Sequence, residues 1–319
     1  MKGRKIALLI LGAALTLQTL AGDSEKEKEF RLAAAIDDVE TMTRLLDQGV
    51  EVNSANKFGK SALMMAIEND NLDATALLLA RGADVNAVTV AGCTALTFAA
   101  ENGHSALTAL LLERDADINA RTRAGWDALM IASRYGLTNM VEQLLFKGAN
   151  PDTRDKDGMT ALLHTAEKGH TDTAAILIKG GAKLETRDKN GSTALIMAAD
   201  KGRADLLDLL LDNGAEINAT DNEGATALVW AVGQDHIEAA ERLIRRGADV
   251  NKQDNDGVTA LMEAASIRSA DLVGLLLVNG ADVEIKDSRG RTVNDIARKR
   301  RNAKVISTLE TYAEEHKIH

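Results

Sequence analysis

Apolar residues recur along this chain at helical spacing, in short segments separated by glycine. In one representative stretch, Thr193 is placed to cap a helix, and a turn at Gly202 leads to a second helix that Gly214 ends in the left-handed conformation. The apolar residues of the two helices each fall on one face: Leu195, Ala198 and Ala199, then Leu206, Leu207, Leu210 and Leu211. The pattern predicts two short helices joined by a turn, each with one buried side.

This pattern repeats every 33 residues, without insertion or deletion. One glycine series marks the period: Gly59, Gly92, Gly125, Gly158, Gly191, Gly224, Gly257 and Gly290. A second series keeps the same spacing, with Asp115 as its exception: Gly49, Gly82, Gly148, Gly181, Gly214, Gly247 and Gly280. Two glycine series in phase predict an all-α repeat solenoid, in which each unit buries its apolar face by stacking on its neighbours.

The repeated unit has a specific sequence. It reads Asp-x-x-Gly-x-Thr-Ala-Leu, then an alanine-rich segment, then Leu-Leu-x-x-Gly-Ala-Asp-Val-Asn. This closely resembles the ankyrin repeat over residues 30–312, and the whole chain resembles an exported, bacterial member of that family. The resemblance implies about nine helix-turn-helix units joined by β-hairpin-like loops. One departure is systematic, because alanines such as Ala194 replace the proline that usually opens the family's first helix. These helix starts should therefore depend more on the preceding Thr or Ser cap.

Both ends of the array have features of capping units. A polar linker at 23–29 precedes a first unit whose Leu32, Ile36 and Met42 match the helix registers. The last unit surrounds its apolar residues with the basic cluster 298–301, which we interpret as the solvated surface of a cap. Residues 313–319 form a polar tail.

Residues 1–22 have the pattern of a secretory signal peptide. Lys2, Arg4 and Lys5 precede an uncharged stretch from Ile6 to Leu20, and small residues follow. This stretch is shorter than the roughly 20 residues of a membrane span. We therefore expect a periplasmic or secreted protein with no membrane insertion after cleavage. The alternative is a membrane anchor formed by an uncleaved N-terminal segment.

Composition narrows the possible partners and chemistry. The formal net charge of −10 argues against nucleic acid, whose phosphates would be repelled. Cys93 is the only cysteine in the chain, so no intramolecular disulfide can form, and its position in the repeat suggests exposure. The sequence has no recognisable nucleophile-and-base pair, so we expect no catalysis and no cofactor.

The histidines are not spaced for a metal site. His104, His170 and His236 share one register two units apart, which separates them by about 20 Å if packed helices lie roughly 8–10 Å apart. We expect these three side chains to hydrogen-bond the turn after the first helix. We expect His164, in a mostly apolar register, to be a buried histidine with a hydrogen-bond partner, and we expect Trp230, in the same register, to pack in the core.

The family resemblance implies a non-catalytic scaffold for protein–protein interaction. Partners of ankyrin repeats dock on the hairpin tips and on the exposed side of the first helix, which line a concave groove. We expect a monomer that binds a protein partner in this way. The alternative is a dedicated regulator, inhibitor or stabiliser of one exported enzyme.

One region combines residue types that are common in binding hot spots. Trp126, Arg134 and Tyr135 fall on the exposed side of the fourth unit, close to arginines and valines at the tips. The predicted partner-binding set is Val88, Val90, Arg121, Arg123, Trp126, Arg134, Tyr135, Arg154, Lys156 and Met159. The alternative is that Trp126 folds over its neighbouring hairpin while the arginines pair with nearby acids.

The export prediction can be tested directly. Because the apolar stretch is short and ends at small residues, the mature chain should begin near Gly22 or Asp23 and be soluble outside the cytoplasm. N-terminal sequencing of the protein from its native source checks this. An intact Met1 on a membrane-bound protein would contradict it.

Overall fold

The computed structural model describes residues 24–316, and the segment expected to direct export lies outside this range. Within the range it contains 18 helices and no strand. They form nine consecutive pairs: α2 (Glu25–Ala35) and α3 (Val39–Asp47), α4 (Ala62–Glu68) and α5 (Leu72–Ala80), α6 (Ala95–Asn102) and α7 (Ser105–Glu113), α8 (Ala128–Arg134) and α9 (Thr138–Phe146), α10 (Ala161–Lys168) and α11 (Thr171–Lys179), α12 (Ala194–Asp200) and α13 (Ala204–Asp212), α14 (Ala227–Gly233) and α15 (Ile237–Arg245), α16 (Ala260–Ile267) and α17 (Ala270–Val278), and α18 (Val293–Arg300) and α19 (Ala303–His316). The predicted all-α repeat solenoid is confirmed.

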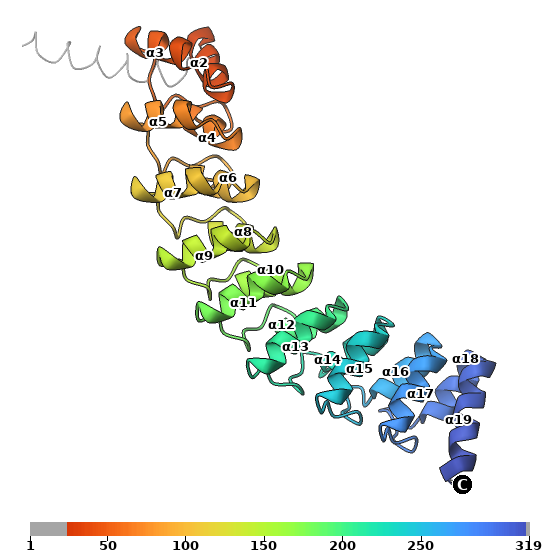
Figure 1. Cartoon of the computed structure of the whole chain (residues 1–319). Helices are drawn as coiled ribbons and strands as arrows, with labels where there is room; N and C mark the ends of the chain where they lie inside the picture. Colours follow the sequence, from red (N-terminus) through yellow and green to blue (C-terminus); the bar gives the residue numbers. More distant parts are fainter. Residues whose placement is uncertain (1–23, 317–319) are drawn as a thin grey trace, which may run out of the picture. The chain divides into compact units, whose positions relative to one another are not determined.

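The chain divides into two bodies, each of which is described by itself. The N-terminal body ends at Arg123 and contains α2–α7, and the C-terminal body begins at Ala124 and contains α8–α19. Within each body the first helices of successive pairs pack on one another, and so do the second helices (Figure 1). The core of each body lies between these two layers and is built mainly from alanine and leucine.

The first helix of each pair from α4 onward begins at a side-chain cap. Thr193 Oγ1 accepts the backbone N–H of Ile196 at 3.4 Å, and Thr226 does the same for Val229 at 3.3 Å. Asp127 takes this role in the fourth pair, with a bond of 2.8 Å to Met130 N–H. Capping therefore replaces the missing proline, as the sequence suggested.

The loops between pairs are tight hairpins, held by an aspartate from Asp155 onward and by Asn56 or Thr89 in the N-terminal body. Asp155 Oδ1 accepts the N–H groups of Asp157 at 2.8 Å and Met159 at 2.9 Å. Each tip also bonds to the tip before it, as when Lys189 N–H donates to Asp157 O at 3.0 Å. Isolated antiparallel bridges, such as Thr220 with Thr226, confirm that the loops resemble β-hairpins.

The three histidines in one register join neighbouring repeats. The Nε2 atom of His170 lies 3.0 Å from the carbonyl oxygen of Arg134, and that of His236 lies 3.1 Å from the carbonyl oxygen of Asp200. His104 makes the equivalent contact to the Glu68 carbonyl at 3.3 Å. Each histidine thus satisfies an otherwise unpaired carbonyl at the end of the preceding first helix, which is the structural role expected from the sequence.

Two features of the N-terminal body differ from expectation. Leu32 and Ile36 are 65% and 74% exposed, because α2 packs on α3 and α4 and its remaining side is uncovered. Met42, which was expected in the core, is buried there together with Phe30. Cys93 is half-buried, and its N–H donates to Thr89 Oγ1 at 3.0 Å.

No helix between residues 24 and 316 is both long and apolar enough to cross a membrane.

The hairpin glycines adopt a positive φ that a larger residue would strain, and this can be tested by substitution. Gly158 has a φ of 77°, and a Cβ added there would lie 3.1 Å from Arg154 Nη2 and 3.3 Å from Asp188 Cα. Gly158→Val should therefore lower the free energy of unfolding by roughly 1–3 kcal/mol. Lys156→Ala, on the same exposed tip, should change it by less than about 0.5 kcal/mol. Denaturant melts compare the two variants, and equal losses would contradict this assignment of the tip.

Candidate functional site

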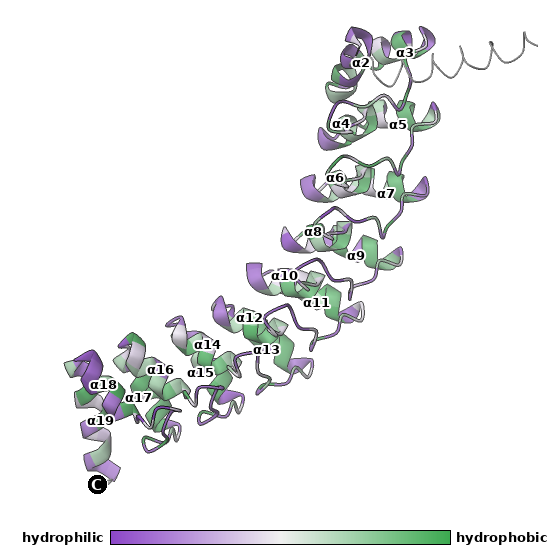
Figure 2. Cartoon of the chain, turned by 180° about the vertical axis from the view of Figure 1, so that it is seen from behind, coloured by the Kyte–Doolittle hydropathy of each residue, from purple (hydrophilic) through white to green (hydrophobic). Residues whose placement is uncertain are grey.

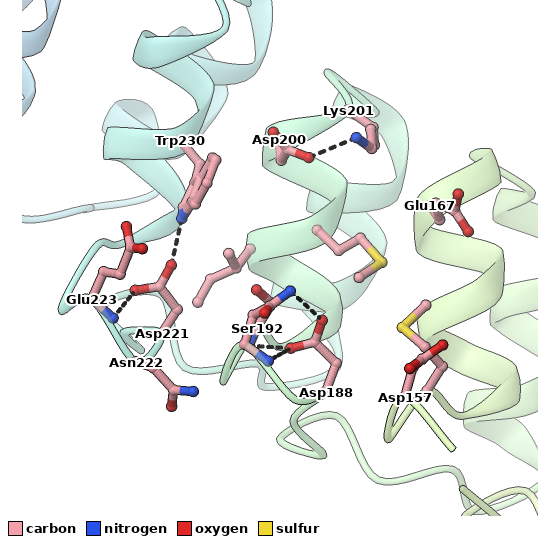
Figure 3. Close-up of a pocket in the computed structure, with 14 residues that line it drawn as sticks. Asp157, Glu167, Asp188, Ser192, Asp200, Lys201, Asp221, Asn222, Glu223 and Trp230 are labelled. Carbon is pink, nitrogen blue, oxygen red and sulfur yellow. Dashed lines mark hydrogen bonds and ion pairs between the residues drawn. The ribbon is translucent and has the colours of Figure 1, made fainter. Parts of the chain in front are cut away.

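The hairpin tips and the exposed sides of the first helices form one surface in the C-terminal body, which we call the tip face. A hollow of about 650 Å³ opens on it, between the tips of successive repeats and the helices α10, α12 and α14 (Figure 3). Its apolar wall consists of Met159, Ile196, Met197 and Trp230. Its carboxylates come from Asp157, Glu167, Asp188, Asp200, Asp221 and Glu223. We call it the acidic hollow.

Trp230 belongs to the wall of this hollow. It is half-buried, and its indole N–H donates to Asp221 Oδ2 at 2.7 Å (Figure 3). The other oxygen of Asp221 accepts the N–H groups of Glu223 at 2.9 Å and Ala225 at 3.0 Å. The expectation that Trp230 packs wholly in the core is therefore wrong. The hairpin aspartate nine residues earlier supplies an acceptor, which holds the indole at the surface.

His164 occupies the same register two repeats earlier and meets the equivalent aspartate. Its Nε2 lies 3.2 Å from Asp155 Oδ2, and only 2% of the residue is exposed. The prediction of a buried, hydrogen-bonded histidine is confirmed for this nitrogen. Nδ1 is also buried, and it has no hydrogen-bond partner in the described part of the chain. Burial lowers the pKa of His164, and the charge and hydrogen bond of Asp155 oppose this only in part.

Trp126 packs over this histidine. The two ring centroids are 4.6 Å apart, and the guanidinium of Arg134 lies 5.3 Å from the centre of the indole. Arg134 Nη1 also pairs with Glu167 Oε2 at 3.0 Å. Trp126 and Arg134 are thus half-buried and engaged with their neighbours, whereas Tyr135 is 52% exposed. Arg134 pairs with an acid, as the alternative interpretation of the sequence expected, but Trp126 packs on a histidine of α10 and not over a hairpin. Glu167 joins this cluster to the acidic hollow.

The ion pairs leave part of the hollow with uncompensated negative charge. Asp157 pairs with Lys189 at 2.6 Å, and Asp200 pairs with Lys201 at 2.9 Å. The hydrogen bond from Lys189 lowers the pKa of Asp157, so this carboxylate stays ionised. Burial raises the pKa of Glu167, but Lys168 and Arg134 outweigh it and the net shift is downward.

Three carboxylates of the acidic hollow lack such a counterion. Within residues 24–316, Asp188, Asp221 and Glu223 form no ion pair with a lysine or arginine. Asp188 lies on one tip beside Ser192, and Asp221 and Glu223 lie on the next tip, at the Trp230 end of the hollow (Figure 3). This end of the hollow therefore combines negative charge with an aromatic face, which suits a cationic side chain.

The remaining residues of the predicted partner-binding set lie on tips of both bodies. Arg154 and Lys156 are exposed in the C-terminal body, and Met159 lines the acidic hollow. In the N-terminal body the exposed residues are Val88, Val90, Arg121 and Arg123. Their role in binding stays a prediction.

Sequence reasoning missed the carboxylates of the acidic hollow. Asp188 and Asp221 are ordinary hairpin residues of the repeat, and Glu223 is a variable tip residue, so none of them stood out. The available signal was the pairing of a hairpin aspartate with a tryptophan nine residues later, where other repeats have aliphatic residues such as Ile131 and Met197.

Comparison with protein families agrees with this architecture. A family model described as ankyrin repeats in three copies matches residues 30–122, 129–221 and 218–287, so the chain belongs to the ankyrin repeat family. No curated protein matches the chain. Proteins of this family are generally non-catalytic scaffolds that bind other proteins. Within residues 24–316, no group of three or more histidine, cysteine or acidic residues is arranged to hold a metal ion.

His164 gives a pH prediction. A histidine whose pKa is lower in the folded than in the unfolded state takes up its proton on unfolding, so its contribution to stability is complete above the unfolded value of 6.5 and is lost as the pH falls below it. Urea melts of the wild type should show this fall, and His164→Met, which installs the residue found at Met65 and Met197, should flatten it. Identical pH dependence of the two proteins would contradict the prediction.

Proposed function

We propose that the protein is an exported, non-catalytic scaffold that binds a protein partner through the tip face of its C-terminal body. The observation that carries the proposal is the uncompensated negative charge of Asp188, Asp221 and Glu223 in a hollow whose wall includes the half-buried indole of Trp230. A lysine or arginine side chain of the partner would enter the acidic hollow there. Export rests on the pattern of residues 1–22 alone.

The chemistry of the hollow favours a long cationic side chain over a small cation. Met159, Met197 and Trp230 offer an apolar surface against which an aliphatic stem can pack, while the charged head reaches the carboxylates. Charge-assisted hydrogen bonds and a cation–π contact each stabilise such a complex. The volume of about 650 Å³ leaves room for more than one side chain of the partner.

The hollow is also largely formed before a partner arrives. Asp188 accepts the N–H groups of Asn190 at 2.9 Å and Ser192 at 2.8 Å, so its carboxylate is fixed by its own hairpin. Asp221 is fixed in the same way and also by Trp230. Groups held in place lose little conformational entropy on binding, which favours affinity. Trp126 and Tyr135, on the same face, would extend the contact, as would Arg154 and Lys156.

The test begins by isolating the partner with the mature protein from the native extracytoplasmic fraction. Calorimetric titration then compares the wild type with Glu223→Lys, which should weaken binding by about tenfold or more, because it puts a positive charge where the partner's cation would lie. Glu241→Lys on α15 changes the net charge equally, away from the tip face, and should leave affinity unchanged.

Two further variants separate the parts of the face. Trp230→Phe keeps an aromatic wall but removes the donor to Asp221, so it should cost about 1–2 kcal/mol of folding stability and weaken binding less than Glu223→Lys does. Trp126→Ala should weaken binding by roughly 2 kcal/mol or more if this indole also contacts the partner. Equal affinities of the wild type, Glu223→Lys and Trp126→Ala would refute the proposed face.

A further inference from the structure

A second hollow, of about 500 Å³, lies on the tip face at the end of the array, between α16, α18 and the tip that joins them. It shares no lining residue with the acidic hollow. Its charge is opposite, because Arg268, Arg289, Arg291, Lys299 and Arg300 surround it. Figure 2 shows α18 as a strongly hydrophilic helix. We call this site the basic hollow.

The basic residues differ in how far their charge is already balanced. Arg291 Nη2 pairs with Asp287 Oδ2 at 2.6 Å, and Arg300 donates to Ser266 Oγ at 2.8 Å. Between residues 24 and 316, the side chains of Arg268, Arg289 and Lys299 have neither an ion pair nor a hydrogen bond. Three uncompensated cations from three different elements therefore face one hollow, in a chain whose net charge is −10.

The floor of the basic hollow is apolar. Met262 and Ile296 are buried beneath it, and Val258 is half-buried at its edge. Glu263 is the one acidic residue among the described residues that line it. Glu263 stands in the register of Trp230 and His164, and burial raises its pKa although the charge of Arg300 opposes the shift. An array of separated cations around an apolar floor is therefore the dominant feature.

We infer that the basic hollow is a second binding site, which takes a short acidic and apolar segment of a protein through its carboxylates. Arg268 follows α16, Arg289 lies on the joining tip and Lys299 lies on α18. Three cations on three separate elements can each meet a different carboxylate of an extended chain. The apolar floor can bury the side chains between those carboxylates. Nucleic acid is disfavoured, because the rest of this acidic chain would repel its backbone.

This site goes beyond the function proposed above, since a partner could use either hollow without the other. Its test therefore uses a defined probe, a short fluorescent peptide rich in glutamate and leucine. Fluorescence polarisation of the full mature chain with this peptide should show binding that weakens as salt is raised. The same peptide with glutamine in place of glutamate should bind at least about tenfold more weakly.

The variants assign the binding to the hollow. Arg289→Glu combined with Lys299→Glu should reduce affinity by about tenfold or more, and the neutral pair Arg289→Gln and Lys299→Gln should give a smaller loss. Neither side chain has a partner in the described range, so circular dichroism should show an unchanged fold. One matched control, the double variant Arg245→Glu with Lys252→Glu, reverses the same charge away from the hollow and should bind like the wild type.

Several outcomes would overturn the inference. The first is that the wild type does not bind the glutamate peptide. The second is that the variant with Arg289→Glu and Lys299→Glu binds the peptide as well as the control with Arg245→Glu and Lys252→Glu does. The third is that inorganic phosphate or a DNA duplex displaces the peptide at concentrations similar to that of the unlabelled peptide, because the site would then recognise phosphate. Unchanged peptide binding in the Arg289 and Lys299 variants, with altered binding in Glu223→Lys, would assign the probe to the acidic hollow and also refute the inference.

Discussion

The tip face depends on one interaction, the acceptance of two backbone N–H groups by one carboxylate oxygen of a hairpin aspartate. Asp155, Asp188 and Asp221 all make it, as do Asp254 and Asp287 nearer the C-terminus. It fixes the tip and leaves the second oxygen facing the first helix of the same repeat. The residue nine positions later then decides what that oxygen meets. The second oxygen of Asp155 meets the imidazole of His164, and that of Asp221 meets the indole of Trp230. At Asp287 the second oxygen instead accepts a hydrogen bond from Arg291. A single framework thereby displays different chemistry in successive repeats.

Much of the fold could be predicted because its determinants are local. A side-chain cap, a glycine with positive φ and a leucine face each act within a few residues, so the same determinants recur from repeat to repeat. The histidine contacts were also predictable, since a fixed register places each imidazole beside the same helix end. Leu32 and Ile36 were assigned incorrectly because register describes an average repeat. In the described residues, the first helix pair has no preceding repeat to cover the side of α2 on which these two residues lie.

The candidate site was harder to predict for a related reason. A register shows which positions are usually buried, and on that basis Trp230 belonged with Met197 and Ile131. What moved it to the surface was a specific bond to Asp221, a property of two side chains together. The acidic hollow has a similar origin, because Asp188 and Glu223 lie on different tips and become neighbours only when repeats stack. In the same way, the net charge of −10 conceals a basic hollow at Arg268, Arg289 and Lys299, since a sum over the chain carries no information on where charges lie.

The hydrogen bonds that join repeats have a consequence for how such a surface can evolve. Successive tips are joined by backbone bonds, such as Lys189 N–H with Asp157 O, and also by some side chains, such as Asn222 Nδ2 with Lys189 O. The histidine contacts span 36 residues, from one repeat to the next. A tip side chain that takes no part in these bonds, such as Lys156 or Glu223, can therefore be exchanged without disturbing the tip, and the effect of the exchange reaches little further than the adjoining repeats. Binding specificity in this chain can be revised one repeat at a time, and duplication of a whole repeat would add new recognition surface while preserving the old.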